Sequence, residues 1–382
     1  MRSMVEGVTL AGAAEDPLSR PPDQVRGPTA PPEGEHLMTL ATAIATGDVS
    51  QLPSRRDEDW RWTDLRGLLR SLPPRPEPAA VTTDGPFAGL GGDLFLVPNG
   101  FVEGFTHIEG AAGEKSVAEL RFVAADPASI TTRVLVAVRA GATLTLLESY
   151  EALADGAVSN IDLDIEVAEG GRLERVVLAA DGPESVTVST ATVRLAPGAS
   201  YAQTILTAGA RRQRIETHVA HPGLGASVRL DGVYLLRDQR HADLTTVVIH
   251  GGHDGTTSQL TKGVVRDQAR GVFQGRIVVE TGADGTEARM GHHALILSDR
   301  AEVDAKPELL IFADDVQCAH GNTIGALDEA AIFYARQRGM PEDVARAMLT
   351  EAFVGEVVDR IEHDGARDVA RQWVSEQLGS AQ

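Results

Sequence analysis

A thiol and an imidazole two residues apart are the side chains in this sequence best suited to chemistry. Cys318 is the only cysteine, and His320 follows it within the segment 313–325, which reads ADDVQCAHGNTIG. If this segment is extended, both side chains project to the same side, about 7 Å apart. Thiolate and imidazole both bind iron and zinc. A buried structural cysteine beside a hydrogen-bonded histidine would produce the same pattern, so the motif alone leaves both interpretations open.

The number of thiols limits what such a site could hold. An iron-sulfur cluster usually needs four protein ligands, mostly thiolates, and this chain has one cysteine. It could therefore hold a cluster only jointly with another chain. A Cys-His-Asp nucleophilic site is the competing use, but nothing else in the sequence marks an oxyanion hole or an acyl-binding pocket. Asp314 and Asp315 either orient the imidazole and accept backbone donors, or are simply turn and cap residues.

Other polar side chains compete for a functional role. Adjacent residues of a strand point to opposite faces, so His292 and His293 cannot readily bind one metal ion. We expect Arg211, Arg212 and Arg214 to form a solvated strand edge, and one of the two tryptophans Trp60 and Trp62 to be in the core. We also expect surface or turn positions for the following histidines: His218, His221, His241, His250, His253, His292 and His293.

Composition and missing motifs exclude several classes of protein. The formal charge of -20 would repel nucleic acids and anionic membrane surfaces. No apolar run approaches the eighteen or so residues that a membrane span needs, and a free thiol suits a reducing compartment, so we expect a cytoplasmic protein. The sequence contains no phosphate loop, H-E-x-x-H, G-x-S-x-G or C-x-x-C motif, and it cannot hydrolyse ATP by the usual route.

Four regions differ in their sequence pattern. Residues 1–35 are rich in proline and predict a disordered leader, with Met38 as an alternative start. Residues 36–92 predict short helices and a proline-rich linker. Residues 93–312 consist of short runs rich in valine, threonine, isoleucine and leucine, broken by glycine, which predict strands and turns. Residues 313–382 contain the Cys-x-His segment and then a helical pattern.

A repeat within the strand region indicates its architecture. Gly141, Gly170 and Gly198 stand at the same place in three similar segments, VRAGATL, VAEGGRL and LAPGASY. Their spacing of about 28 residues predicts a β-solenoid, in which each coil buries its apolar face against the next. A β-sandwich would explain the strands equally well, but not the regular return of one turn sequence.

The last region carries recognisable helix signals. Asp328 can cap a helix that runs to Gly339, and Pro341 suits the first turn of a second helix. A third helix is expected over residues 366–378. The chain is therefore predicted to be mainly β, with a β-solenoid core flanked by N-terminal and C-terminal helical segments.

Several segments together resemble the SufB/SufD family of iron-sulfur cluster assembly proteins. They are residues 55–63 with two tryptophans, 263–275, 294–301, 306–329 with the Cys-x-His motif, 332–339 and 351–356. The SufD type fits better than the SufB type, because the chain is short and lacks additional cysteines. The resemblance implies a right-handed parallel β-helix core flanked by helical domains.

The resemblance also implies partners. One is a SufB-like paralogue docked through the β-helix; the other is the ABC-type ATPase SufC, bound to the C-terminal helical domain, which would supply the missing phosphate loop. By the same resemblance Cys318 and His320 lie at the interface where a nascent cluster forms, and His320 is the stronger candidate. Expected partner-interface residues are Asp314, Asp315, Gly321, Thr323, Phe333, Tyr334, Arg338 and Phe353.

The sequence departs from the family pattern at four positions. Ala319 and Asn322 stand at variable positions of the motif, where the family commonly reads Cys-Ser-His-Gly-Ala-Thr. Met290 and His292 stand where the family usually has a glutamine and an asparagine. The resemblance therefore carries no polar role over to Met290 or His292.

These observations predict a scaffold subunit rather than an enzyme. It would share a transient iron-sulfur cluster with its partner, bind no nucleotide, bind little iron when isolated, and form a homodimer where the partner is absent. A structural adaptor without a metal role is the first alternative. A β-helix enzyme acting on polysaccharide is the second, but it would need aromatic platforms for sugars, and aromatic residues make up 4% of the chain.

Overall fold

Two parallel sheets form the body of the protein in this computed structural model, which describes residues 40–102 and 107–379. The predicted leader at 1–35 and the alternative start Met38 lie outside the described residues. The sheets have nine and eight strands. The strands are β1 (Asp93–Pro98), β2 (Ile108–Gly110), β3 (Lys115–Ala124), β4 (Ser129–Val138), β5 (Thr143–Ala152), β6 (Val158–Val167), β7 (Arg172–Ala180), β8 (Val186–Leu195), β9 (Ser200–Thr207), β10 (Arg212–His221), β11 (Ser227–Leu236), β12 (His241–His250), β13 (Thr256–Val265), β14 (Arg270–Val279), β15 (Glu287–Ile296), β16 (Glu302–Ile311) and β17 (Gln317–Gly325).

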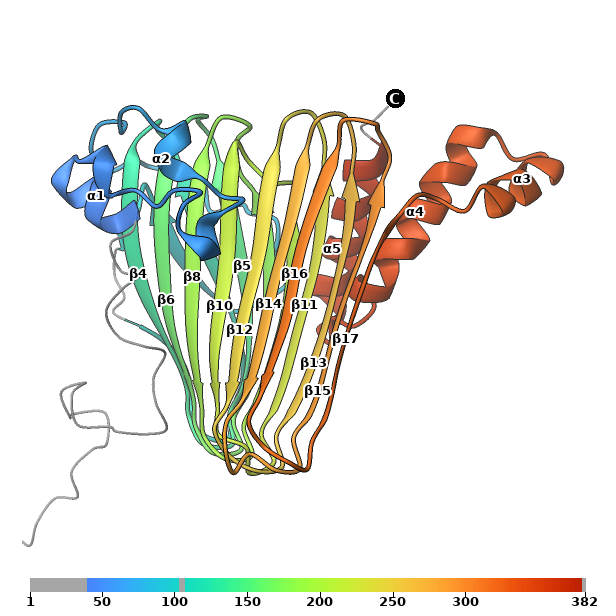
Figure 1. The fold of residues 1–382 in the computed structure, drawn as a ribbon. Coiled ribbons are helices and arrows are strands. Elements are labelled where there is room, and N and C mark those ends of the chain that lie inside the picture. Colours follow the sequence, from blue (N-terminus) through green and yellow to red (C-terminus); the bar gives the residue numbers. More distant parts are fainter. Residues whose placement is uncertain (1–39, 103–106, 380–382) are drawn as a thin grey trace, which may run out of the picture. The chain divides into compact units, whose positions relative to one another are not determined.

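The order of the strands confirms the predicted solenoid. All odd-numbered strands lie in the first sheet and all even-numbered strands in the second, so the chain crosses from one sheet to the other after each strand (Figure 1). Each strand from β1 to β15 pairs in parallel with the strand two places later. The turn glycines Gly141, Gly170 and Gly198 have φ values of 65°, 65° and 67°, a conformation that favours glycine. The repeat seen in the sequence is thus the repeat of one turn per coil.

Apolar side chains from both sheets fill the inside of the solenoid, but a charged pair lies among them. Arg175 of β7 donates two hydrogen bonds of 2.7 Å to the carboxylate of Glu148 on β5, and a third of 2.8 Å to Gln203 on β9. Tyr150 donates to the same carboxylate. Burial alone would lower the pKa of Arg175, but the Glu148 carboxylate reverses this effect and keeps the guanidinium charged.

The N-terminal segment covers the outer face of the second sheet. It contains α1 (Leu40–Thr46), two short 3-10 helices, η3 (Val49–Gln51) and η4 (Glu58–Trp60), and α2 (Leu65–Leu68). Trp60 is buried and stacks on Arg214, whose guanidinium carbon lies 4.6 Å from the ring centroid. Arg214 also lies 2.9 Å from Asp243. The prediction of a solvated edge was therefore wrong for Arg214, because the N-terminal segment covers this outward position.

Three helices follow the strands: α3 (Glu329–Gln337), α4 (Glu342–Val358) and α5 (Asp364–Gly379). Asp328 caps α3 as expected, accepting a hydrogen bond from the N–H of Ala330. Helices α4 and α5 pack on the outer face of the first sheet through one apolar cluster. No helix in the described part of the chain is long and apolar enough to span a membrane.

The turn between α4 and α5 is fixed to the first sheet by charged groups. The N–H groups of Glu362 and His363 donate to the carboxylate of Glu174 on β7, at 2.5 and 3.0 Å. Arg360 forms an ion pair of 3.0 Å with Asp231 on β11, whose pKa burial raises to about 7. The C-terminal helices are therefore joined to the solenoid by polar as well as apolar contacts.

Candidate functional site

Cys318 and His320 lie on β17, the last strand of the first sheet. The prediction that the strands stop at Phe312 was wrong, because β17 pairs with β15 over its whole length. In this pairing Cys318 lies beside Ala288, and His320 beside Met290. Both β15 residues belong to the buried interior, so the two β17 residues continue rows that point to the inside of the solenoid.

These inner rows are open to solvent at β17. Within residues 107–379 no strand pairs with the far side of β17 or of β16. Cys318 is therefore half-buried and His320 is exposed. Burial raises the pKa of the Cys318 thiol, and this effect exceeds that of a hydrogen bond from the backbone of Ala288. The thiol and the imidazole thus share one face at the open end, but neither is enclosed.

The acidic residues of the motif lie away from the imidazole. Asp314 and Asp315 are in the turn before β17, and their contacts are with the preceding turn: the N–H of Asp314 donates to Asp284 at 3.3 Å, and the carbonyl of Asp315 accepts from Gly285 at 2.7 Å. They act as turn residues here. Gly321 lies on β17 in open space, where an added Cβ would meet no atom within 4 Å.

Side chains at the open end are unusually apolar for a surface. Leu310, Ile311, Phe312 and Ile324 are all exposed. The backbone is also unpaired on one side of β17. The N–H of Gln317 bonds to the carbonyl of Thr286, directly before β15, so the N–H groups of Cys318, His320 and the further even-numbered residues of β17 point to the free edge. An apolar surface beside an unpaired strand edge is typical of a site where another chain binds.

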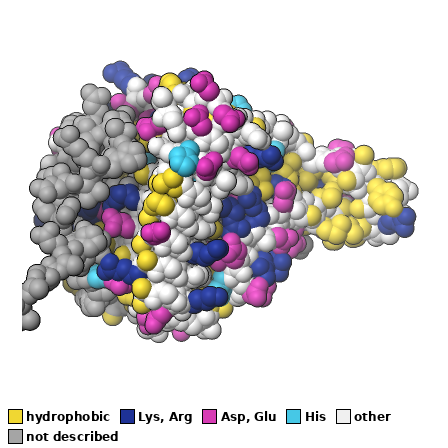
Figure 2. Space-filling model, turned by 90° about the horizontal axis from the view of Figure 1, so that it is seen from below, with side chains coloured by type: hydrophobic (Ala, Val, Ile, Leu, Met, Phe, Trp, Pro, Cys, Tyr) yellow, Lys and Arg dark blue, Asp and Glu magenta, His cyan; other side chains and the backbone are white. Residues whose placement is uncertain are grey.

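A second exposed apolar surface lies on α3 and α4 (Figure 2). Phe333 and Tyr334 of α3 are 62% and 61% exposed, and Arg338 donates a hydrogen bond of 2.8 Å to the Tyr334 hydroxyl. Phe353 of α4, in contrast, is half-buried beneath the Lys262 ammonium, which lies 4.5 Å from its ring centroid. The structure therefore brings Phe333, Tyr334 and Arg338 together, while Phe353 fixes α4 to the solenoid.

Several histidines are buried, contrary to the predicted surface or turn positions. His221 and His250 lie side by side on β10 and β12 inside the solenoid, with ring centroids 4.2 Å apart. Burial lowers their pKa values to about 4 and about 3. His241 is buried on the outer face, beneath the N-terminal segment, and burial lowers its pKa to about 3. Of the remaining ones, His253 is exposed, as expected.

His292 is also buried, and sequence reasoning missed its polar role. Its Nε2 atom lies 2.8 Å from the Tyr234 hydroxyl, and its Nδ1 atom lies 2.7 Å from Oδ1 of Asn322. Burial lowers its pKa to about 4, so the ring is neutral at physiological pH. His292 and Asn322 are two of the four departures from the family pattern, and they are hydrogen-bonded to each other. One sequence without its homologues could not reveal this pairing.

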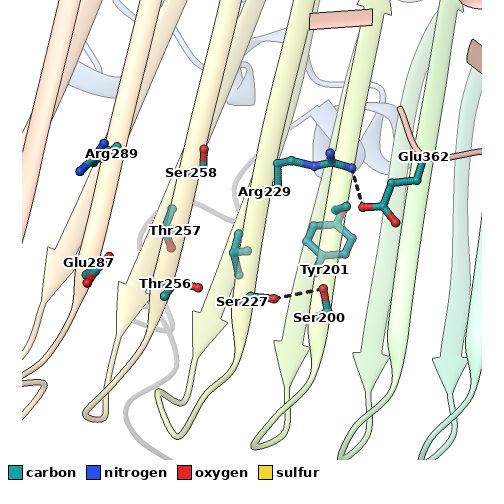
Figure 3. Close-up of a pocket in the computed structure, with 12 residues that line it drawn as sticks. Ser200, Tyr201, Ser227, Arg229, Thr256, Thr257, Ser258, Glu287, Arg289 and Glu362 are labelled. Carbon is teal, nitrogen blue, oxygen red and sulfur yellow. Dashed lines mark hydrogen bonds and ion pairs between the residues drawn. The ribbon is translucent and has the colours of Figure 1, made fainter. Parts of the chain in front are cut away.

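A groove on the outer face of the first sheet is a separate feature. It has a volume of about 380 Å³, and its lining includes several serine and threonine side chains, with a 3.1 Å hydrogen bond between Ser200 and Ser227 (Figure 3). Arg229 crosses it to pair with Glu362 at 3.1 Å. The groove does not include Cys318. It therefore does not complete the Cys-x-His site.

Ligands for a metal ion are incomplete in the part of the chain that the structure describes. Among residues 40–102 and 107–379, no group of three or more histidine, cysteine, aspartate or glutamate side chains is placed to hold a metal ion. Cys318 and His320 could contribute at most two ligands, and they do so at an open surface. Within these residues, a metal ion at Cys318 and His320 would therefore lack the remaining ligands that it needs.

Comparison with known proteins agrees with this arrangement. Residues 121–353 match the family described as SUF system FeS cluster assembly, SufBD core domain. This chain belongs to the SufBD family. It is an iron-sulfur cluster assembly protein of the SufD kind, as the sequence predicted.

Individual relatives support the assignment over different shares of their length. The iron-sulfur cluster assembly protein SufD of Escherichia coli is 25% identical over 91% of this chain and 93% of its own length. A SufBD family protein of Synechocystis is 29% identical, but the match covers 65% of this chain and 57% of that protein. SufD of Bacillus subtilis is 32% identical over 34% of this chain and 30% of its own length.

Proposed function

We propose that this protein is a cytoplasmic scaffold subunit that pairs with a SufB-like chain and shares a nascent cluster site with it. The observation that carries the proposal is the position of Cys318 and His320 on the inner face of the last, uncovered coil. A partner that covers this coil would enclose both side chains and could supply the missing thiolates. The chain itself would hold and release the cluster without catalysing a reaction.

The free edges of β16 and β17 differ in how well their backbones could pair with a strand of a partner chain. Directly after β16, the N–H of Phe312 bonds to Val279 of β14, so the backbone N–H groups at odd-numbered positions of β16 point to the free edge. One of these positions is Pro307, which has no N–H to donate. On β17 every outward position has a donor, including Cys318 and His320. Backbone pairing with a partner is thus favoured along β17, the strand that carries the site.

A second partner, the ATPase SufC, is proposed to dock on the surface formed by Phe333, Tyr334 and Arg338. An exposed apolar helix face with an arginine at its side is typical of a protein-binding surface. Helix α4 connects this surface to the solenoid, where Glu356 forms an ion pair of 2.5 Å with Lys262 on β13. Movement of α4 driven by nucleotide binding to the ATPase would therefore act on the coils next to the site.

Anaerobic reconstitution tests the shared site. The chain alone, and its complex with the SufB-like and ATPase partners, would be supplied with ferrous iron and sulfide, followed by absorption spectroscopy and iron counting. We expect a cluster in the complex, little iron on the chain alone, and loss of the cluster in His320→Ala. The matched control is His253→Ala, because His253 is an exposed histidine in the turn between β12 and β13 and is not part of β17. Equal cluster loading in His320→Ala would show a structural adaptor instead.

A further inference from the structure

Three side chains form a hydrogen-bonded series from the interior of the solenoid to its open end. It begins at the hydroxyl of Tyr234 on β11, continues through the imidazole of His292 on β15, and ends at the amide of Asn322 on β17, with distances of 2.8 and 2.7 Å. Tyr234 and His292 are completely buried, whereas Asn322 is exposed. The series therefore fixes one polar group at the surface from within the core.

The residues around Tyr234 and His292 hold this series in place by close packing. A Cβ atom at Gly263 would lie 1.9 Å from the Tyr234 ring, and one at Gly271 would lie 2.5 Å from it, so both positions must be glycine. Phe273 stacks on His292 with a centroid distance of 4.7 Å and an angle of 1° between the rings. These residues belong to the segment 263–275. That segment is thus used to fix the tyrosine and the imidazole.

The direction of the hydrogen bonds follows from the groups involved. A neutral imidazole has one N–H donor and one acceptor nitrogen. Because Oδ1 of Asn322 can only accept, Nδ1 of His292 must carry the proton. Its Nε2 atom then accepts from the Tyr234 hydroxyl. The amide oxygen of Asn322 is held by the coil behind it. Its NH₂ group makes no hydrogen bond to the residues that the structure describes, so this donor is available to a molecule bound at the open end.

Asn322 lies in the same inner-facing set of β17 residues as Cys318 and His320. It follows His320 by two residues, which corresponds to about 7 Å along a strand. A group bound by the imidazole or the thiol would lie within reach of the amide. Hydrogen bonds from N–H groups to the sulfur atoms of clusters are one of the means by which proteins stabilise and tune them.

We propose that Asn322 is a positioning residue that donates a hydrogen bond to anionic sulfur, thiolate or sulfide, of the cluster assembled beside His320, and that Tyr234 and His292 fix its orientation. This inference rests on the proposed function. The series does not transfer protons, because it ends on a carboxamide, which neither gains nor loses a proton at neutral pH. Its role is to present a donor of fixed direction.

Variants at Asn322 separate a donor role from a structural one. Asn322→Leu removes both the donor and the acceptor. Asn322→Asp keeps an acceptor for His292 but replaces the NH₂ donor with a negative charge. Tyr234→Phe leaves Asn322 intact and removes only the inner end of the series. Gln317→Ala is the control, because Gln317 is an exposed residue of the same strand that points to the outer face.

The assay uses the complex with the SufB-like and ATPase partners, loaded anaerobically with ferrous iron and sulfide. It measures the rate of iron release to a chelator and the position of the sulfur-to-iron absorption bands. The loss of one hydrogen bond to a charged group changes a binding or release constant roughly tenfold. We expect release about ten times faster in Asn322→Leu, faster still in Asn322→Asp, and about twofold faster in Tyr234→Phe, with shifted bands in the first two variants.

The outcomes distinguish this inference from the proposed function. If Asn322→Asp behaves like the wild type while Asn322→Leu is impaired, Asn322 only supports His292, and the inference is wrong. It is also wrong if every variant keeps the wild-type release rate and bands while the cluster still depends on His320. A wild-type complex that takes up no cluster would overturn both proposals.

Discussion

The buried ion pair between Arg175 and Glu148 offers a direct test of how the solenoid interior is stabilised. Replacing Arg175 with methionine would leave the Glu148 carboxylate in the core with the Tyr150 hydroxyl as its remaining partner. Both members of the pair are 0% exposed, so water cannot replace the lost guanidinium. Breaking a buried pair in this way costs about 3–5 kcal/mol of the free energy of unfolding.

The double variant Glu148→Leu with Arg175→Met should recover most of this loss. Removing both charges also removes their desolvation cost, and the neighbouring polar groups keep other partners. Tyr150 remains 2.8 Å from Ser189, and Gln203 keeps hydrogen bonds from Tyr201 and Thr217. We expect the double variant to lie within about 1–2 kcal/mol of the wild type.

Urea unfolding followed by far-ultraviolet circular dichroism would give the free energy of unfolding of the wild type, both single variants and the double variant. The coupling energy of this cycle is the decisive quantity. If the double variant loses as much stability as the two single variants added together, the two side chains act independently, and the reasoning is refuted.

Two further predictions concern docking and acidity. Phe333→Ser should weaken binding of the ATPase by at least tenfold in titration calorimetry, with no change in melting temperature, because Phe333 is an exposed side chain. Unchanged affinity would exclude this surface. His221 and His250 have depressed pKa values of about 4 and about 3 in the folded protein, against about 6.5 when unfolded. Above pH 6.5 both rings are neutral in the folded and in the unfolded protein, so their contribution to stability is fully present. As the pH falls from 6.5 towards 4, the unfolded protein binds protons that the folded protein does not, and the free energy of unfolding should drop by roughly 2–3 kcal/mol for each ring. A His221→Leu/His250→Leu variant should show a flatter pH dependence of the free energy of unfolding; an identical slope would contradict this account.

The repeat was the part of the fold that the sequence predicted best. Turn glycines such as Gly141 recur because one backbone conformation is needed once per coil, and this requirement is visible in the sequence. The end of the solenoid was not predicted. The first six residues of β17, QCAHGN, include none of the β-branched residues typical of strands, and the strand is held in place by its pairing with β15.

The environment of individual polar residues was harder to predict than the strands. Alternation along a strand separates His292 from His293, but it does not tell which face is inside. Arg214 lies on an outward face, and its burial is explained by the N-terminal segment, where Trp60 stacks on it and the Asp59 carbonyl accepts its hydrogen bond. The position of Cys318 and His320 on a single face was predictable from their spacing, whereas the openness of that face depends on where the stack of coils ends.

The position of the site on the final coil has a consequence for local stability. An inner coil is held by a neighbour on each side, whereas β16 and β17 are paired on one side within residues 107–379. In a one-dimensional array the free energy of local opening depends on these nearest neighbours. The amides of β17 should therefore exchange with solvent faster than those of β9 or β11, and binding of a partner should slow them. The strand that carries Cys318 and His320 would become rigid only when a second molecule completes the stack.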